Sequence, residues 1–334
     1  MQRSNRGFRA RGVAAVLALL LCGTASAQDD GARAYWKAME GTNIVAFQYL
    51  PFAGDSFGSQ VFDPVHYTYP VSTVQANIAM LTYARHLTLF GQPAVFGVSL
   101  MGGNLDVDFS QSPLGVGPAA DFQQAAHGFG DPSAQLSVNL AGAPAIKSFY
   151  DITKYEPKAV LDIAVMGAFP IGEYDPDKVV NMGLNRWWTR VALPFTYHFG
   201  PFVPGYRKSI EIIPSVLLFG SNDDFLGHTL ANDPLYQLEA HVTRDFTAKF
   251  FSSVDVLYRH GALSEIDGLK IAGELDLLTV GFTLDYGVND NMGLRVSYHS
   301  IVGGDANLDG DMFRIGVNFG WNGLVEKVKK LQSH

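Results

Sequence analysis

The sequence predicts an all-β fold, a transmembrane antiparallel up-and-down β-barrel of about twelve strands with short helical segments at its two ends. Three observations lead to this prediction. Apolar residues occupy every second position in most extended segments, the connections between segments alternate between long and short, and aromatic residues collect where segments end. A sheet with one apolar face that closes on itself in a membrane accounts for all three.

The alternation is clearest near the C-terminus. Large apolar side chains occupy the odd positions of residues 313–321, whereas arginine, glycine and asparagine occupy the even positions. Residues 278–286 and 294–298 repeat the pattern. Because a strand sends successive side chains to opposite faces, each segment has one apolar face and one polar or empty face.

Residues 1–27 predict a cleavable export signal. Four arginines precede an apolar core at 13–21, and small residues at 25 and 27 form the cleavage site. Cleavage removes Cys22, the single cysteine, so the mature chain can form no disulfide and no Cys-ligated metal site. It also removes four arginines and no acids, which changes the net charge from −8 to −12. An acidic exported protein without basic clusters is a poor nucleic-acid binder.

The two ends of the mature chain lie outside the predicted barrel. Residues 28–41 form a short N-terminal segment, in which four apolar residues at 32, 35, 36 and 39 predict one face of a short helix. Residues 322–334 form a C-terminal tail that also has an amphipathic helical pattern. Neither is long enough to be a stable helix alone in water, so each needs a surface to pack on. The N-terminal segment is either a plug that enters the barrel, which we favour, or a frayed end, and the C-terminal tail is more simply interpreted as a frayed end.

Residues 42–321 form the predicted barrel. Residues 102–132 are its longest predicted loop, and residues 141–158 are irregular with one helical face. The predicted strands are 42–50, 72–90, 94–101, 133–140, 159–170, 186–199, 209–220, 236–246, 250–260, 278–286, 294–299 and 312–321.

The connections alternate in length along the chain. The short ones are 91–93, 200–208, 247–249 and 287–291, and 141–158 is the exception to the alternation. Bacterial outer-membrane barrels have an even number of strands, short periplasmic turns and longer outer loops. An even strand number also places both chain ends at the short-turn end. The long connections are 51–71, 102–132, 171–185, 221–234, 261–274 and 304–310.

Aromatic residues at the strand ends form two predicted girdles, as at the two interfaces of a membrane. A soluble β-sandwich would also alternate, but its outer face would be rich in charge, and only 17% of these residues are charged. Aromatics at the short-turn ends are Phe90, Phe199, Phe202, Tyr206, Phe246, Phe250, Phe251, Tyr286 and Trp321. Those at the long-loop ends are Tyr49, Trp187, Trp188, Tyr236 and Tyr258.

Five motifs lie at strand ends and turns: residues 41–43, 128–132, 139–144, 170–175 and 181–187. They read Gly-Thr-Asn, Gly-Phe-Gly-Asp-Pro, Asn-Leu-Ala-Gly-Ala-Pro, Pro-Ile-Gly-Glu-Tyr-Asp and Asn-Met-Gly-Leu-Asn-Arg-Trp. In these motifs the chain resembles the outer-membrane transporters named after the MetA pathway of phenol degradation. The resemblance implies a barrel channel tied to the uptake of aromatic compounds.

The chain departs from related barrels at both ends. A channel that secretes amyloid subunits has a similar barrel, but it usually carries a coiled-coil N-terminal extension. Here about fourteen residues precede the first strand, too few for several heptads. Outer-membrane barrels typically end on an aromatic residue that the barrel-assembly machinery reads, whereas thirteen residues follow Trp321.

Ten charged or titratable residues on the predicted polar faces are candidates for lining a channel. They could form charge rings that set solute preference, or they could fill the lumen with salt bridges. The ten are Arg190, His198, Glu239, His241, Asp255, Arg259, Asp285, Arg295, His299 and Arg314. The same faces carry Gln48, Asn77, Gln135, Asn139, Asp162 and Asn318.

The four arginines of this set, at 190, 259, 295 and 314, would favour anionic solutes unless Glu239, Asp255 and Asp285 neutralise them. Glu239 and His241 share one face, but no third ligand follows at a clear spacing, and we expect no metal and no cofactor.

We expect a channel in the bacterial outer membrane for passive uptake of small hydrophobic or aromatic solutes. Its expected partners are outer-membrane lipid, the solute and the barrel-assembly machinery, and it could be a monomer or a homo-oligomer. The alternatives are a secretion channel or a structural barrel with a plugged lumen. We expect no enzyme, because adjacent strand residues such as His299 and Ser300 point to opposite faces and cannot act as base and nucleophile.

Overall fold

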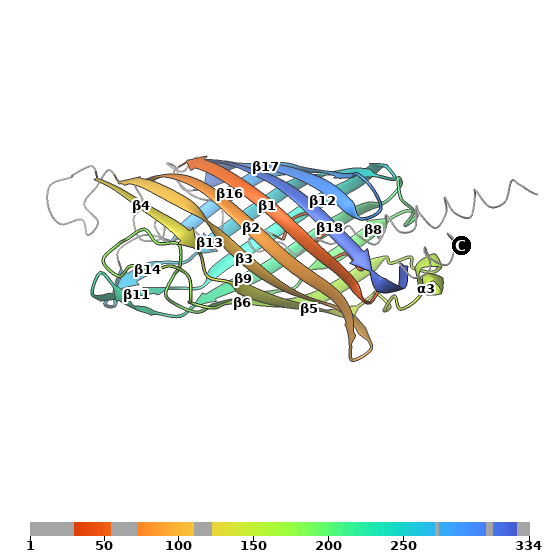
Figure 1. Ribbon diagram of the computed structural model, residues 1–334, viewed down its shortest axis with the longest axis horizontal. Helices are drawn as coiled ribbons and strands as arrows, with labels where there is room; N and C mark the ends of the chain where they lie inside the picture. Colours follow the sequence, from red (N-terminus) through yellow and green to blue (C-terminus); the bar gives the residue numbers. More distant parts are fainter. Residues whose placement is uncertain (1–29, 55–71, 110–121, 271–273, 305–309, 326–334) are drawn as a thin grey trace, which may run out of the picture.

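Figure 1 shows the computed structural model, which describes residues 30–54, 72–109, 122–270, 274–304 and 310–325 of the 334-residue chain. Over these residues the chain forms a closed antiparallel barrel of twelve strands, which confirms the predicted fold. The predicted export signal at 1–27, residues 28–29 and the tail beyond 325 lie outside the described residues.

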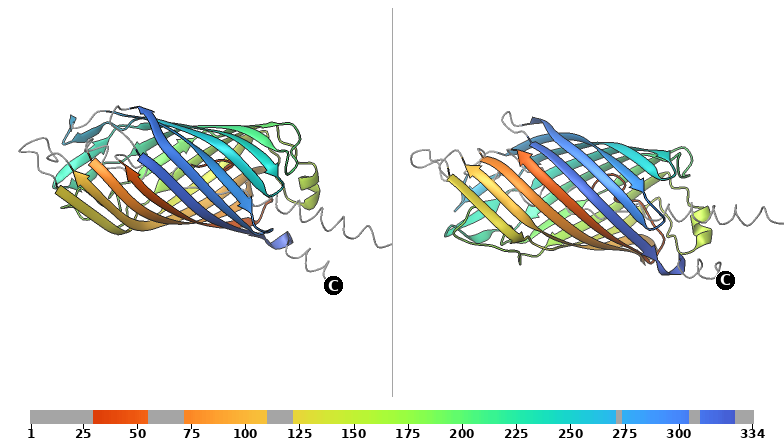
Figure 2. Two further views of the ribbon diagram at one scale, coloured as in Figure 1. Left: turned by 90° about the horizontal axis from the view of Figure 1, so that it is seen from above. Right: turned by 45° about the horizontal axis from the view of Figure 1, so that its top comes forward.

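The wall is built from strands that are neighbours in the sequence. β9 pairs with β12, the next strand of the wall, and the pairing of the first strand, β1, with the last, β18, closes the ring (Figure 2). β7 and β8 follow one another and share one place in the wall, because both pair with β6 and β9. The strands are β1 (Thr42–Gly54), β2 (Ser72–Leu89), β3 (Gln92–Phe109), β5 (Ser133–Ala141), β6 (Ala159–Ala168), β7 (Trp188–Ala192), β8 (Phe195–Phe199), β9 (Lys208–Phe219), β12 (Leu235–Thr247), β13 (Phe250–Gly261), β16 (Leu275–Gly287), β17 (Met292–Gly304) and β18 (Gly310–Asn322).

The predicted strand 186–199 is divided into β7 and β8 at Pro194. Proline has no backbone N–H and cannot donate to a ladder. Its carbonyl still accepts from Asp162 N at 2.9 Å, and Leu193 N donates to Pro214 O at 3.0 Å. The two prolines therefore interrupt the ladder locally without opening the wall.

The outer face of the barrel is apolar. Val280, Phe282, Val296 and Val317 are 37–41% exposed. Their alternate neighbours, such as Ser297, are buried inside. The described residues contain no helix long and apolar enough to cross a membrane.

The predicted aromatic girdles are partly confirmed. Tyr206, Phe246 and Tyr286 are exposed at the short-turn end, as are Trp187, Tyr236 and others at the long-loop end. Phe251 and Trp188 depart from the prediction, because both are buried inside the barrel. A position near a strand end does not show whether a side chain points into the barrel or out of it. The alternation of the neighbouring residues determines that direction.

The polarity of the two faces of the wall inverts toward the long-loop end, where the inner face is apolar and the outer face is polar. On β2, Val74, Ala76 and Ile78 point inward and are buried, whereas Gln75 and Asn77 point outward. The expectation that Asn77 faces the lumen was therefore wrong. The apolar inner surface packs against loops that fold into this end, and together they form one cluster of buried residues. That cluster includes Leu50, Leu105, Val179, Val180, Met182, Leu184, Leu217, Phe225, Leu230 and Leu277.

The described parts of the predicted loop 102–132, residues 102–109 and 122–132, are mostly β-structure, so that prediction was wrong there. β3 continues to Phe109, and β4 (Phe122–Phe129) pairs with its outer part. In this stretch Leu105 and Val107 are buried while Asp106 and Asp108 are exposed. The polar side chains made the segment look like a loop, but they mark a strand whose outer face lies in water.

Two other long connections form a separate four-stranded sheet at the long-loop end. Its strands are β10 (Asn222–Phe225), β11 (His228–Asn232), β14 (Ser264–Ile266) and β15 (Leu269–Lys270). Phe225, Leu230 and Ile266 bury their side chains in the cluster described above. This sheet and the loop 171–185 pack against the inner wall at the long-loop end.

Asp131 ties the loop 171–185 to the wall. Its carboxylate is 1% exposed and accepts from Gly172 N and Leu184 N, both at 2.8 Å. The backbones approach closely here, because a Cβ on Gly172 would lie 2.7 Å from the carbonyl carbon of Gly130. Three of the five motifs that carry the family resemblance thus meet at one joint.

The short-turn end carries a short helix and the start of the tail. α3 (Phe149–Thr153) lies in the irregular connection 141–158 and is capped by Ser148. The tail begins as a helical turn at 323–325, and Val325 is buried with Met39 and Ile146. Figure 1 shows α3 and the end of β18 at this end of the barrel.

Arginine on the outer face should destabilise the barrel according to its depth. Val254 is 58% exposed and lies opposite Phe282, in the middle of the apolar face. In lipid bilayers Val254→Arg should lower the free energy of unfolding by about 2–4 kcal/mol. Gln75→Arg, on the polar outer face of β2, is the matched control and should change it little. Reversible urea unfolding in liposomes measures both, and equal losses would contradict a lipid-facing Val254.

Removal of the Asp131 carboxylate should loosen the joint without opening the wall. Asp131→Ala leaves two buried N–H groups without acceptors, which costs about 1–3 kcal/mol each. Hydrogen exchange at Gly172 and Leu184 should accelerate while exchange in β1 and β18 stays slow. Asp223→Ala, at an exposed position of β10, is the control. Unchanged exchange at both amides would show that Asp131 does not hold the loop.

Candidate functional site

The ten residues predicted to line a channel all lie inside the barrel. None is more than 7% exposed. They form a polar lumen, by which we mean the buried polar residues in the middle and the short-turn half of the barrel. The predicted polar faces of the strands are therefore present, and the lumen between them is filled. The contacts described below show which residues fill the lumen.

The N-terminal segment lies inside this lumen. Asp30, Ala32, Arg33 and Met39 are 0–1% exposed. The predicted helix is absent from the described part, because residues 32–35 form a turn in which Arg33 has a φ of 65°. The backbone instead donates to the wall, from Asp30 N to Glu239 at 3.0 Å and from Arg33 N to Glu211 at 2.7 Å.

Arg33 makes the first anchor of the segment. Its Nη1 lies 2.6 Å from the Asp245 carboxylate, and its Nε donates to Thr243 Oγ1 at 3.0 Å. The guanidinium carbon lies 4.1 Å from the Trp36 ring centroid and 3.9 Å from that of Phe251. The cation is thus held between two aromatic faces, which attract it electrostatically.

Asp30 makes the second anchor. Its carboxylate accepts from both terminal nitrogens of Arg190, at 2.9 and 2.7 Å, and from the Tyr35 hydroxyl at 2.9 Å. Arg190 also contacts Glu239 at 3.1 Å. The bidentate geometry fixes both distance and orientation.

Lys37 and Trp36 complete the contacts. Lys37 Nζ lies 2.6 Å from Asp162 Oδ1, and Trp36 Nε1 donates to Glu211 at 3.0 Å. Burial lowers the pKa of the Lys37 amine, and the Asp162 carboxylate opposes this effect. The Trp36 ring packs edge-on against His198 at 5.0 Å. Breaking a buried ion pair leaves an uncompensated charge at a cost of about 3–5 kcal/mol, so the segment is firmly held.

On the other side of the lumen, wall residues bind one another. His241 Nδ1 lies 2.8 Å from Asp255, and Arg295 Nε donates to Asp285 at 2.9 Å. Arg259 Nε donates to Gln237 at 2.9 Å. On this side, salt bridges and hydrogen bonds fill the space that a channel would need.

Sequence reasoning missed four wall residues that bind the segment: Thr243, Arg207, Glu211 and Asp245. Glu211 lies on β9, where apolar residues on both faces hide the alternation. Arg207 was assigned to a turn, but it lies inside and donates to Asp245 at 2.6 Å. Asp245 belongs to the predicted strand 236–246, on the same face as Glu239 and His241. Extending that polar face by two residues would have found it.

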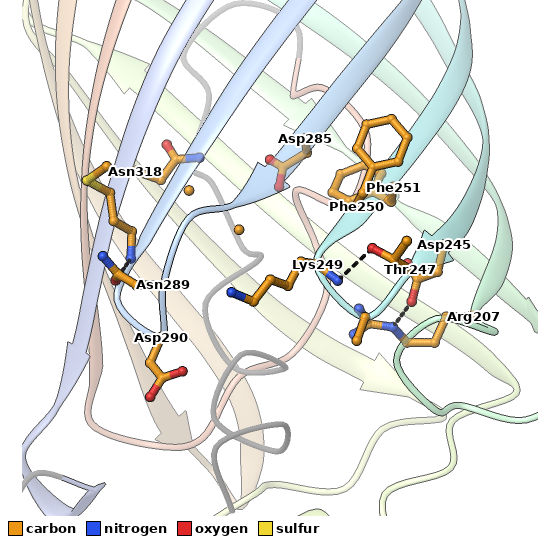
Figure 3. Close-up of a pocket in the computed structure, with 14 residues that line it drawn as sticks. Arg207, Asp245, Thr247, Lys249, Phe250, Phe251, Asp285, Asn289, Asp290 and Asn318 are labelled. Carbon is orange, nitrogen blue, oxygen red and sulfur yellow. Dashed lines mark hydrogen bonds and ion pairs between the residues drawn. The ribbon is translucent and has the colours of Figure 1, made fainter. Parts of the chain in front are cut away.

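A small pocket of about 50 Å³, partly open to solvent, lies at the short-turn end (Figure 3). Its inner wall includes Asp245 and Phe251, which hold Arg33, and its rim includes Lys249 and Asp290 in two short turns. The pocket therefore borders two of the side chains that hold Arg33, the first anchor of the N-terminal segment.

The described residues include no group of three or more His, Cys, Asp or Glu side chains placed to hold a metal ion. Glu239 and His241, the pair that the sequence singles out, lie 3.5 Å apart. Both take part in the hydrogen-bonded network with Arg190 and Asp255.

The chain is similar to several solved structures. An outer membrane channel from Pseudomonas putida F1 is 15% identical, with a TM-score of 0.64 over 84% of this chain and 96% of that one. The β domain of the Bordetella autotransporter BrkA is 9% identical, with a TM-score of 0.47 over 84% and 100%. A mutant of the monoaromatic hydrocarbon channel TodX is 10% identical, with a TM-score of 0.44 over 92% and 98%. At these identities the first likeness shows the fold alone.

No curated protein sequence matches the chain at a significant level. Residues 54–307 match the model of the family described as "Putative MetA-pathway of phenol degradation". The match spans more than half of the chain and confirms the resemblance carried by the motifs. The chain therefore belongs to the MetA-pathway phenol-degradation family.

Proposed function

We propose that the protein is a channel of the bacterial outer membrane for passive uptake of small hydrophobic or aromatic solutes, and that residues 30–41 close it. The observation that carries this proposal is the N-terminal segment inside the polar lumen. It fills the lumen with a part of the chain that belongs to no strand of the wall.

The outer surface supports a position in the membrane. An apolar outer face would be costly in water and is favourable in lipid. The closed ring of pairings leaves no strand edge to meet the lipid, because β1 pairs with β18 and β9 with β12. We infer that the short-turn end, with the N-terminal segment and α3, faces the periplasm.

The way in which the segment is held supports a gate. Its ties to the lumen wall described above are hydrogen bonds to side chains, ion pairs and ring contacts. Its departure would leave every strand pairing of the barrel intact. The pocket at the short-turn end borders Asp245 and Phe251, two of the side chains that hold Arg33.

The buried apolar cluster at the long-loop end supports a preference for hydrophobic solutes. A solute that enters from this end must pass Ile78, Met182 and their neighbours, which offer no hydrogen bonds from their side chains. Such a path favours aromatic compounds over sugars.

The tight ion pairs of the segment favour a second candidate function, a structural barrel with a plugged lumen. A measurement of conductance decides between the channel and the structural barrel.

Deletion of residues 30–40 from the mature chain should raise single-channel conductance in planar bilayers. The wall keeps its pairings, so heat-modifiable migration on gels should be unchanged. In asymmetric bilayers with lipopolysaccharide, flux of catechol should increase more than flux of arabinose.

Asp267→Asn in the full-length chain is the control, because Asp267 lies in the exposed turn between β14 and β15. Its conductance should equal that of the unmodified protein. A correctly folded deletion variant with unchanged conductance would favour the structural barrel. Larger flux of arabinose than of catechol would contradict the solute preference but not the channel.

A further inference from the structure

We propose that the open pore prefers cationic over anionic solutes, and that Glu211 and Asp162 determine this preference. This inference rests on the proposed function, because it concerns the wall after the N-terminal segment has left. Its basis is the unequal charge of the segment and of the surface that holds it.

The segment supplies the lumen with more positive than negative charge. Arg33 and Lys37 bind acids of the wall, and Asp30 binds a base. The wall groups around them comprise four acids and two bases. They are Asp162, Glu211, Glu239, Asp245, Arg190 and Arg207. Departure of the segment therefore leaves this side of the wall with an excess of acid.

Two of the four acids keep a basic partner within the wall. Glu239 retains Arg190 at 3.1 Å, and Asp245 retains Arg207 at 2.6 Å. These pairs do not involve the segment, so they persist when it leaves. The excess of acid is thus localised on the other two residues.

Glu211 receives its hydrogen bonds from neutral groups. Arg33 N and Trp36 Nε1 belong to the segment, and only Ser209 Oγ, at 2.8 Å, belongs to the wall. His241 lies opposite Glu211 in the ladder of β9 and β12, but its ring nitrogens face Asp255 at 2.8 Å and Glu239 at 3.5 Å. Without the segment, Glu211 keeps one neutral donor.

Asp162 would likewise lose its partner from the segment and keep only a neutral donor of the wall. Its Oδ1 accepts from Lys37 Nζ at 2.6 Å and from Asn139 Nδ2 at 3.0 Å. Its Oδ2 is buried and has no hydrogen-bond partner among the residues that the structure describes. Loss of Lys37 would leave a carboxylate held by one amide, with an oxygen already open to a donor from the lumen.

The arginines of the lumen have less influence on a passing ion. Arg190 and Arg295 keep Glu239 and Asp285 as wall partners. Arg259 donates to Gln237, whose amide in turn donates to Glu239, so Arg259 is also tied to a carboxylate of the wall. Carboxylates without a basic partner at the pore surface attract cations and repel anions. This opposes the anion preference that the arginines alone suggest.

Reversal potentials in a KCl gradient test the proposal. The barrel that lacks residues 30–40 should prefer potassium over chloride by roughly threefold or more, since two uncompensated carboxylates line its wall. Adding Glu211→Gln and Asp162→Asn should remove most of this preference. Adding Asp267→Asn instead makes one acid neutral outside the lumen and should leave it unchanged. A chloride preference, or no effect of the double change, would overturn the proposal.

A full-length variant covers the case in which the truncated barrel does not fold. Arg33→Gln with Lys37→Gln keeps the segment but removes the two cations that it brings. This variant should conduct more than the unmodified protein and should also prefer potassium. A preference for chloride in this variant would count against the proposal.

A binding measurement separates this proposal from the proposed function. Methylammonium carries the head group of Lys37, which binds Asp162, and methanol is a neutral analogue of similar size. In detergent, methylammonium should raise the Tm of the truncated barrel, methanol should not, and Glu211→Gln with Asp162→Asn should abolish the rise. If the truncated barrel does not conduct but shows this rise, the channel proposal fails and the cation-binding wall stands. Absence of the rise would overturn the inference whatever the conductance.

Discussion

The structure depends on closure of the backbone ladder. The pairings of β1 with β18 and of β9 with β12 leave each strand of the ring with a neighbour on both sides. Closure satisfies the backbone groups, and so it frees the side chains to differ on the two faces. It also creates an interior that must be filled. This chain fills it in two different ways, with apolar loops at one end and with paired charges at the other.

The paired charges follow from the low polarity of the interior. A buried carboxylate or guanidinium is tolerated only when it is paired or hydrogen-bonded. The wall alone does not supply enough partners on the side of β6, β9 and β12, and the N-terminal segment brings the missing ones through Arg33 and Lys37. The contacts that close the lumen thus also supply the partners that its buried charges need. A change in the segment therefore acts on both the opening of the barrel and its electrostatics.

Much of the fold could be predicted from the sequence, because alternation over long strands reports which face is buried. It located the strands, the long and short connections and the ten inward residues. It did not locate β4 or the outward direction of Asn77. Both lie toward the long-loop end, where the outer face of the wall is polar and the inner face is apolar. It could not give the conformation of residues 30–41 either. Apolar spacing suggested a helix, but hydrogen bonds to Glu211 and Glu239, about two hundred residues away, decide that conformation.

The position of the N-terminal segment has a consequence for the order of folding. Asp30 and Arg33 contact residues 160 to 212 positions later in the chain. Contacts of such sequence separation form late, because a long loop must close before they are gained. Here the receiving surface does not exist until β9 and β12 have paired. We therefore expect the segment to dock after β9 and β12 have paired, so that closure of the wall precedes closure of the lumen.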